Sequence, residues 1–153
     1  MRVKILLPSW TALPDLPTAR KSSAAVHIPG LGDLVVGGCN NTRSLSNAEL
    51  LKTKRIGEGT VFYWTEINPM IRPKSAPIAE YFDKRVYVFG VSFDMEMLSM
   101  LSGVPGEWTL IIHHNLPYNM ATQSMCVFNG KILVSGKFVV VWFIRLLFLK
   151  RIP

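Results

Sequence analysis

The side chains that could do acid–base or metal chemistry are few, and they lie in separate parts of the chain. His113 and His114 are neighbours near the end of an apolar run, and His27 lies alone in another run. Neither a carboxylate nor a third histidine follows the pair at three or four positions, where a further ligand on the same element would stand. We therefore interpret the pair as surface or strand-edge residues and His27 as a packed side chain, and we expect neither a metal nor another cofactor.

The candidate nucleophiles also lack local partners. Ser22, Ser23 and Ser99 have no acid–base group placed to activate them, and the pattern G-x-S-x-G of a nucleophile elbow does not occur. The stretch "GEGT", residues 57–60, has the glycines of a phosphate-binding loop but not its Lys-Ser/Thr ending or its following helix. We therefore expect a protein that is not an enzyme.

The positive charge of the chain is dispersed. The formal net charge is +7 and the isoelectric point is near 9.7, but the basic clusters are short and scattered. A nucleic-acid-binding surface normally concentrates Lys and Arg on one element, so we expect no nucleic-acid partner. Cys39 and Cys126 have no disulfide or metal spacing, which favours reduced thiols in a cytoplasmic protein. The apolar run at residues 5–7 is too short for a secretory signal.

Short apolar runs alternate with turn residues throughout the chain, which is typical of β-strands. Val, Ile, Tyr, Phe and Trp dominate these runs, and Gly, Pro, Asn or Asp separates them. Asn129-Gly130 tolerates the positive φ that a two-residue hairpin turn requires, and "FDKR" stands in the same place between two other runs. Helical periodicity is weak and confined to residues 46–54 and 95–102, which we interpret as strand with a variable loop.

The apolar runs belong to a unit that the chain repeats. Three runs, "LVVGG", "VYVFGV" and "ILVSGK", end in glycine, and a tryptophan followed by threonine precedes each of them at 26 to 28 residues. The tryptophans are 54 and 44 residues apart, and repeats of this length are typical of propellers, solenoids or arrays. The residues of this repeat are Trp10, Gly37 and Gly38, then Trp64 and Gly90, then Trp108 and Gly136.

The order of these residues resembles the Kelch repeat. The closest match is "LVVGGCNNTRSLSNAELL" followed by "YWTEINPM", and the resemblance covers about residues 8–137. The second glycine of the pair is replaced by Val91 in the second unit and by Lys137 in the third. The resemblance implies an all-β fold, a partial Kelch-type β-propeller of about three four-stranded antiparallel blades with the last incomplete.

Closed propellers use about four to eight blades, so three units would be part of a ring. We expect a fragment of a longer propeller, or an arc that closes by association with other chains. The Kelch-repeat region is assigned to residues 1–137, with its units starting near Trp10, Trp64 and Trp108.

Residues 138–153 are assigned to an apolar and basic tail. Phe138–Leu149 is apolar except for Arg145, and its twelve residues fall short of the roughly 20 that a spanning helix needs. Membrane association is therefore not favoured, and a strand or helix packed on apolar surface is the alternative.

The resemblance also implies where a partner would bind. In Kelch propellers the loops at one end of the ring usually hold a partner peptide, and a basic residue with a serine before the innermost strand commonly lines that surface. Counting back 16 or 17 residues from the glycine gives Arg20 with Ser22 and Ser23, and Lys74 with Ser75, while Met120 stands there in the third unit. Such cations would attract an acidic peptide through charge-assisted hydrogen bonds.

The function that the resemblance implies is protein–protein interaction. Many Kelch-like proteins join the propeller to BTB and BACK regions and recruit substrates to a cullin-type ubiquitin ligase, and others bind actin. The fold also occurs in copper oxidases, but their ligand set of tyrosines and histidines is not recognisable here. A propeller enzyme of oxidase or hydrolase type is therefore the alternative outside the binding class.

Overall fold

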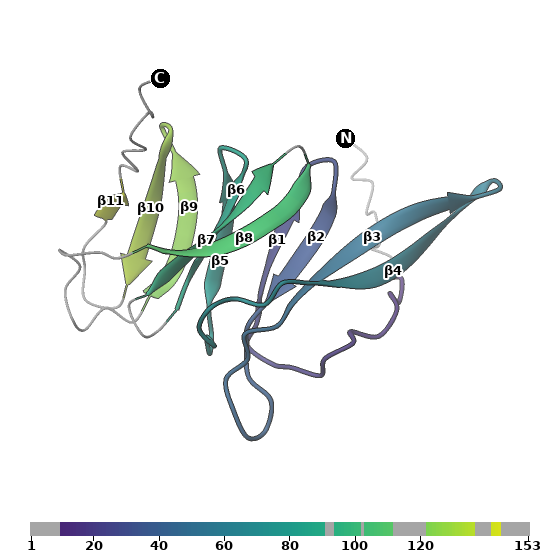
Figure 1. Ribbon diagram of the computed structural model, residues 1–153, viewed down its shortest axis with the longest axis horizontal. Helices are drawn as coiled ribbons and strands as arrows, with labels where there is room; N and C mark the ends of the chain where they lie inside the picture. The colour runs from purple at the N-terminus through teal and green to yellow at the C-terminus, as the bar shows by residue number, and fades with distance from the viewer. Residues whose placement is uncertain (1–9, 91–93, 102, 112–121, 137–141, 145–153) are drawn as a thin grey trace, which may run out of the picture.

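The computed structural model describes residues 10–90, 94–101, 103–111, 122–136 and 142–144, and these residues contain strands and turns but no helix (Figure 1). The expectation of an all-β protein is confirmed. The strands are β1 (Ala24–Ile28), β2 (Gly32–Val36), β3 (Ala48–Ile56), β4 (Gly59–Ile67), β5 (Ile78–Phe82), β6 (Arg85–Phe89), β7 (Met95–Leu101), β8 (Val104–Ile111), β9 (Thr122–Phe128), β10 (Lys131–Gly136) and β11 (Trp142–Ile144).

The strands form three antiparallel sheets that follow one another along the chain. The first sheet has the order β1-β2-β3-β4, the second β5-β6-β7-β8, and the third β9-β10-β11. The first strand of each sheet contacts the first strand of the next, β1 with β5 and β5 with β9. The sheets therefore lie side by side in the same orientation, as Figure 1 shows.

Tight hairpins connect the first two strands of each sheet. In the second and third sheets the loop has two residues, since Phe82 pairs with Arg85 and Phe128 pairs with Lys131. Both residues of each loop have positive φ, which matches the twist of the flanking strands. The hairpins expected at "FDKR" and Asn129-Gly130 are thus confirmed.

The second sheet is buried on both faces, and this explains the continuous apolar run "VYVF" in β6. Successive side chains of a strand point to opposite faces. Val86 and Val88 accordingly join a core with the first sheet, whereas Tyr87 and Phe89 join a core with the third. Fully buried members of the two cores include Leu34, Val36 and Leu50 from the first sheet and Ile132 and Val134 from the third.

The repeated residues fall at equivalent places, but the sheets do not begin where the predicted units begin. Gly37, Gly90 and Gly136 lie at the ends of β2, β6 and β10, the second strand of each sheet. Trp64 and Trp108 lie in β4 and β8, which are the last strands of the first and second sheets. Each predicted unit therefore runs from the last strand of one sheet into the next sheet. Trp10 precedes β1 and is 95% exposed.

Two weaker sequence features also take a place in the sheets. Residues 46–54 and 95–102 supply β3 and β7, so the interpretation of this slot as strand is confirmed. Trp142–Ile144 forms β11 and pairs with β10, so part of the segment assigned to a tail continues the third sheet. In the part of the chain that the structure describes, no helix has the length and apolar character to cross a membrane.

Candidate functional site

The two segments that lead into β1 and β5 are structural counterparts. Arg20 and Lys74 each stand four residues before the first residue of their strand, Ala24 or Ile78. Two residues after each cation the backbone turns through positive φ, at Ser22 (53°) and Ala76 (44°). Counting back from Gly37 and Gly90 in the sequence therefore gives structurally equivalent positions. Met120, and with it His113 and His114, lies outside the described residues.

Lys74 is buried in a cluster of charges. Its Nζ lies 2.9 Å from Asp94 Oδ1 and 3.0 Å from Glu96 Oε1, and its side chain has no exposed area. Glu96 also accepts hydrogen bonds from the backbone N–H groups of Ile71 and Arg72, at 2.6 and 2.9 Å. The ammonium is therefore neutralised inside the protein, and the cluster fixes the segment before β5 to the start of β7.

Arg20 forms the corresponding pair in the first sheet. Its Nη2 lies 2.8 Å from Glu49 Oε1, and both side chains are buried. Its Nη1 donates to the carbonyl oxygens of Gly37 and Asn47, each at 3.1 Å. The planar guanidinium with its several donors can meet all these acceptors at once.

The two carboxylates are also counterparts, although their surroundings differ. Glu49 pairs with Val35 across β2 and β3, and Glu96 pairs with Val88 across β6 and β7. Where Ile71 donates a backbone N–H to Glu96, the first unit has Pro17, which has no N–H. Glu49 Oε2 is buried, and it has no hydrogen-bond partner among the described residues.

The prediction that Arg20 and Lys74 present free positive charge to a partner is therefore not met. Burial without a counter-charge would be costly, so each cation is paired with carboxylates that come later in the chain. The serines predicted beside them remain nearer the surface, with Ser22 and Ser23 exposed and Ser75 half-buried.

The glycines at the ends of β2 and β6 make room for these segments. Gly37 and Gly38 have positive φ, 60° and 89°, and a Cβ on Gly38 would lie 2.6 Å from the carbonyl oxygen of Lys21. Gly90 has a different role, since a Cβ there would lie 3.0 Å from Cδ of Lys74. The glycine of the second unit therefore leaves a path for the buried lysine side chain.

The same end of the sheets carries a continuous surface of loops, which we call the loop face and define as residues 19–23, 39–47 and 71–75. Backbone hydrogen bonds link the three segments: Lys21 exchanges bonds with Cys39, and Lys74 donates to Leu45. In Figure 1 the segment 39–47 forms the loop that projects furthest below the first sheet. Surface hollows of about 250 and 510 Å³ adjoin Asn40 and Ser46.

Three cations on the loop face are exposed where Arg20 and Lys74 are not. Lys21 and Arg43 are exposed, and Arg72 is 56% exposed although its Nη1 lies 3.7 Å from Asp94 Oδ2. Sequence reasoning missed this set as partner-binding residues. Lys21 adjoins Arg20 in a basic pair, which was the only available signal for it.

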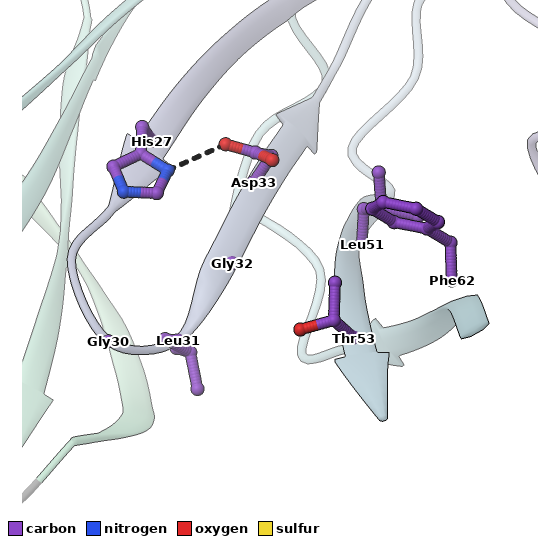
Figure 2. A pocket seen from close by; sticks show the side chains of 8 residues that line it. All are labelled: His27, Gly30, Leu31, Gly32, Asp33, Leu51, Thr53 and Phe62. Carbon is purple, nitrogen blue, oxygen red and sulfur yellow. Dashed lines mark hydrogen bonds and ion pairs between the residues drawn. The ribbon is translucent and has the colours of Figure 1, made fainter. Parts of the chain in front are cut away.

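Another hollow, of about 390 Å³, lies at the opposite end of the first sheet (Figure 2). His27 and Asp33 stand opposite each other on β1 and β2, with Nδ1 and Oδ1 2.7 Å apart. The imidazole is 68% exposed, so the interpretation of His27 as a packed side chain is wrong. The lining residues are His27, Gly30, Leu31, Gly32, Asp33, Leu51, Thr53 and Phe62.

Tryptophan indoles join the last strand of the first and of the second sheet to the segment that precedes that sheet. Trp108 Nε1 of β8 donates to the carbonyl of Asn68, at 2.7 Å, and Trp64 Nε1 of β4 donates to the carbonyl of Pro14, at 2.9 Å. Pro14 and Asn68 each stand four residues after the preceding tryptophan. The tryptophan spacing found in the sequence therefore corresponds to a repeated bond between successive units.

Replacing Trp108 by phenylalanine is expected to lower the free energy of unfolding by about 2 kcal/mol, because a buried indole bond and part of a packed ring are lost. The measurement is urea unfolding followed by circular dichroism. Trp10→Phe is the matched control, since Trp10 is 95% exposed and its change should cost under about 0.5 kcal/mol. Equal effects of the two substitutions would contradict the proposed role of the bond.

Burial raises the pKa of two groups in the second sheet. For Tyr87, burial raises the pKa to about 12, with the positive charge of Arg85 acting against the shift. For Glu80, burial raises the pKa and a backbone hydrogen bond from Tyr81 opposes it. Within the described residues no three His, Cys, Asp or Glu side chains are grouped to hold a metal ion.

Comparisons with known proteins do not assign this chain to a family. No protein-family model matches the sequence, and no curated protein matches it significantly.

Proposed function

We propose that this chain is a protein-interaction module of Kelch type, and that its loop face binds an acidic segment of a partner protein. The observation that carries the proposal is the set of exposed cations on hydrogen-bonded loops, Lys21, Arg43 and Arg72. Serine and asparagine side chains surround them, which suits charge-assisted recognition of carboxylates. Arg20 and Lys74 act beneath this surface by holding the segments in place.

Contacts that recur between successive sheets and units support a propeller as the architecture. The first strands of successive sheets are in contact, and the cation–carboxylate pair and the tryptophan bond each recur at equivalent positions. A blade cannot bury both of its faces without neighbours, and the second sheet has a neighbour on each face. These features favour blades of a partial Kelch-type propeller over a sandwich.

The broader role follows from the resemblance to Kelch-like proteins. We propose a cytoplasmic protein that recognises a partner, as the substrate-binding part of a cullin-type ubiquitin ligase adaptor does. Actin binding is the second candidate within the same class. Binding is favoured over catalysis because the buried charged side chains beneath the loop face are paired with one another. They hold the loops in place and are not presented to a substrate.

The loop face can be tested with a fluorescein-labelled peptide of Asp, Glu, Ser and Gly, whose binding is followed by fluorescence anisotropy. Charge reversal at Lys21, Arg43 and Arg72 together should weaken binding about tenfold or more, since electrostatic complementarity is lost. The control reverses charge at Lys84, Arg85 and Lys131 instead, which lie beside the β5–β6 and β9–β10 turns, outside the loop face, and change the net charge equally. Equal losses in the two variants would show attraction to overall charge and would contradict a site on the loop face.

A further inference from the structure

The β3–β4 hairpin extends beyond the rest of the first sheet. β2 begins at Gly32, and its pairing with β3 reaches only as far as Asp33 opposite Leu51. Beyond Leu51, β3 pairs with β4 alone among the described strands, over Lys52–Ile56. In Figure 1 this part of the hairpin projects away from the sheets. One edge of β3 therefore ends in a row of backbone groups that no described strand covers.

The hollow of Figure 2 lies beside that uncovered edge. Its walls are the turn between β1 and β2 on one side and Leu51, Thr53 and Phe62 of the hairpin on the other. The space therefore continues the line of β2 at the point where β2 is absent. We call this place the edge notch and define it by Gly30–Asp33 and Lys52–Ile56.

The side chains of the hairpin give the edge notch two different sides. Alternation and pairing place Lys52 with Tyr63 and Lys54 with Val61 on one face, and Thr53 with Phe62 on the other. The lysine face also exposes apolar side chains, Ile56, Val61 and Tyr63. Phe62 is partly exposed on the hollow side. By the same alternation Arg55 lies on the face of Thr53 and Phe62. A strand beside β3 would thus meet Lys52 and Lys54 on one face and the hollow beside Phe62 on the other.

We propose that the edge notch binds an extended acidic segment of a partner protein, which pairs with β3 as an additional strand. Acidic residues stand opposite Lys52 and Lys54, where opposite charges across strands are favourable. The residue between them points to the other face, and an apolar side chain there enters the hollow beside Phe62. The sequence recognised is therefore acidic, apolar, acidic in consecutive positions.

A peptide strand can form hydrogen bonds with the backbone of this edge, which the alternative ligands of the lysines cannot do as well. Backbone N–H and C=O groups along Lys52–Ile56 can pair with a peptide backbone, whereas a lipid surface would leave them unpaired. A second copy of this chain would bring two chains of net charge +7 together. Asp33 lies at the inner end of the edge notch, where its negative charge disfavours an acidic side chain in the hollow.

The test uses short fluorescein-labelled peptides and fluorescence anisotropy. A peptide with a Glu-Leu-Glu core should bind the wild-type chain about tenfold or more tightly than one with a Leu-Glu-Leu core, which places leucine opposite the lysines. A Glu-Pro-Glu core should also bind about tenfold more weakly, since proline blocks strand pairing. Equal binding of the three peptides would overturn the proposal.

Variants of the chain separate this site from the loop face. Lys52→Glu with Lys54→Glu should abolish the preference for the Glu-Leu-Glu core, whereas reversal of Lys21, Arg43 and Arg72 should leave it intact. Vesicles of phosphatidylcholine and phosphatidylserine are the competing ligand. Binding of wild-type chain to vesicles through the two lysines without peptide selectivity would overturn the proposal, as would self-association that the double variant removes.

Discussion

Replacement of Lys74 by methionine is expected to lower the free energy of unfolding by about 3–5 kcal/mol, the largest effect among the single substitutions considered. Methionine keeps the length of the side chain but leaves the carboxylates of Asp94 and Glu96 without the ammonium that lies 2.9 and 3.0 Å from them. A buried charge that has lost its partner is costly because water cannot solvate it. Urea unfolding followed by circular dichroism measures the loss, since urea does not screen charges.

Two further variants make this expectation specific to the buried cluster. Arg72→Met removes an exposed cation from the same cluster and should cost under about 1 kcal/mol. Lys74→Met combined with Asp94→Asn and Glu96→Gln removes both charges with the cation and should recover part of the stability. A Lys74→Met protein as stable as the wild type would show that the ammonium does not hold the segment before β5.

Alanine at Gly38 is expected to lower the free energy of unfolding by about 2–4 kcal/mol, the second large effect. The backbone of Gly38 has φ 89°, and the added Cβ would lie 2.6 Å from the carbonyl oxygen of Lys21. The left-handed conformation costs about 1–2 kcal/mol for an L-residue, and displacement of the neighbouring backbone adds a similar amount. The urea midpoint should fall accordingly.

Gly30→Ala is the matched control for this substitution. Gly30 also has positive φ, 77°, but a Cβ there would have no neighbour within 4 Å. Its cost should be limited to about 1–2 kcal/mol of backbone strain. Equal stability of the two alanine variants would show that the close approach of Gly38 to the segment before β1 does not affect the free energy of unfolding.

The features of the fold that the sequence predicted are those with local causes. The second strand of each sheet was identified from an apolar run that ends in glycine, and the hairpins from residues that tolerate positive φ. The apolar run of β6 is continuous because both faces of that strand are buried. Each of these signals lies within a few neighbouring residues, so it can be seen without the fold.

The parts that could not be predicted depend on residues brought together from far along the chain. Arg20 and Lys74 were found at equivalent positions, but Glu49 and Glu96 become their partners only through the register of the sheets. A basic residue before a strand has the same appearance in a sequence whether it is paired or free. The edge notch likewise arises from the different lengths of β2 and β3.

The indole bonds have a consequence for the history of the chain. Trp64 reaches Pro14 and Trp108 reaches Asn68, and each bond joins corresponding residues of adjacent units. Loss or duplication of one whole unit by unequal recombination would bring another tryptophan to another carbonyl of the same kind. The number of units can therefore change in a single genetic event without leaving a tryptophan indole that has lost its carbonyl acceptor.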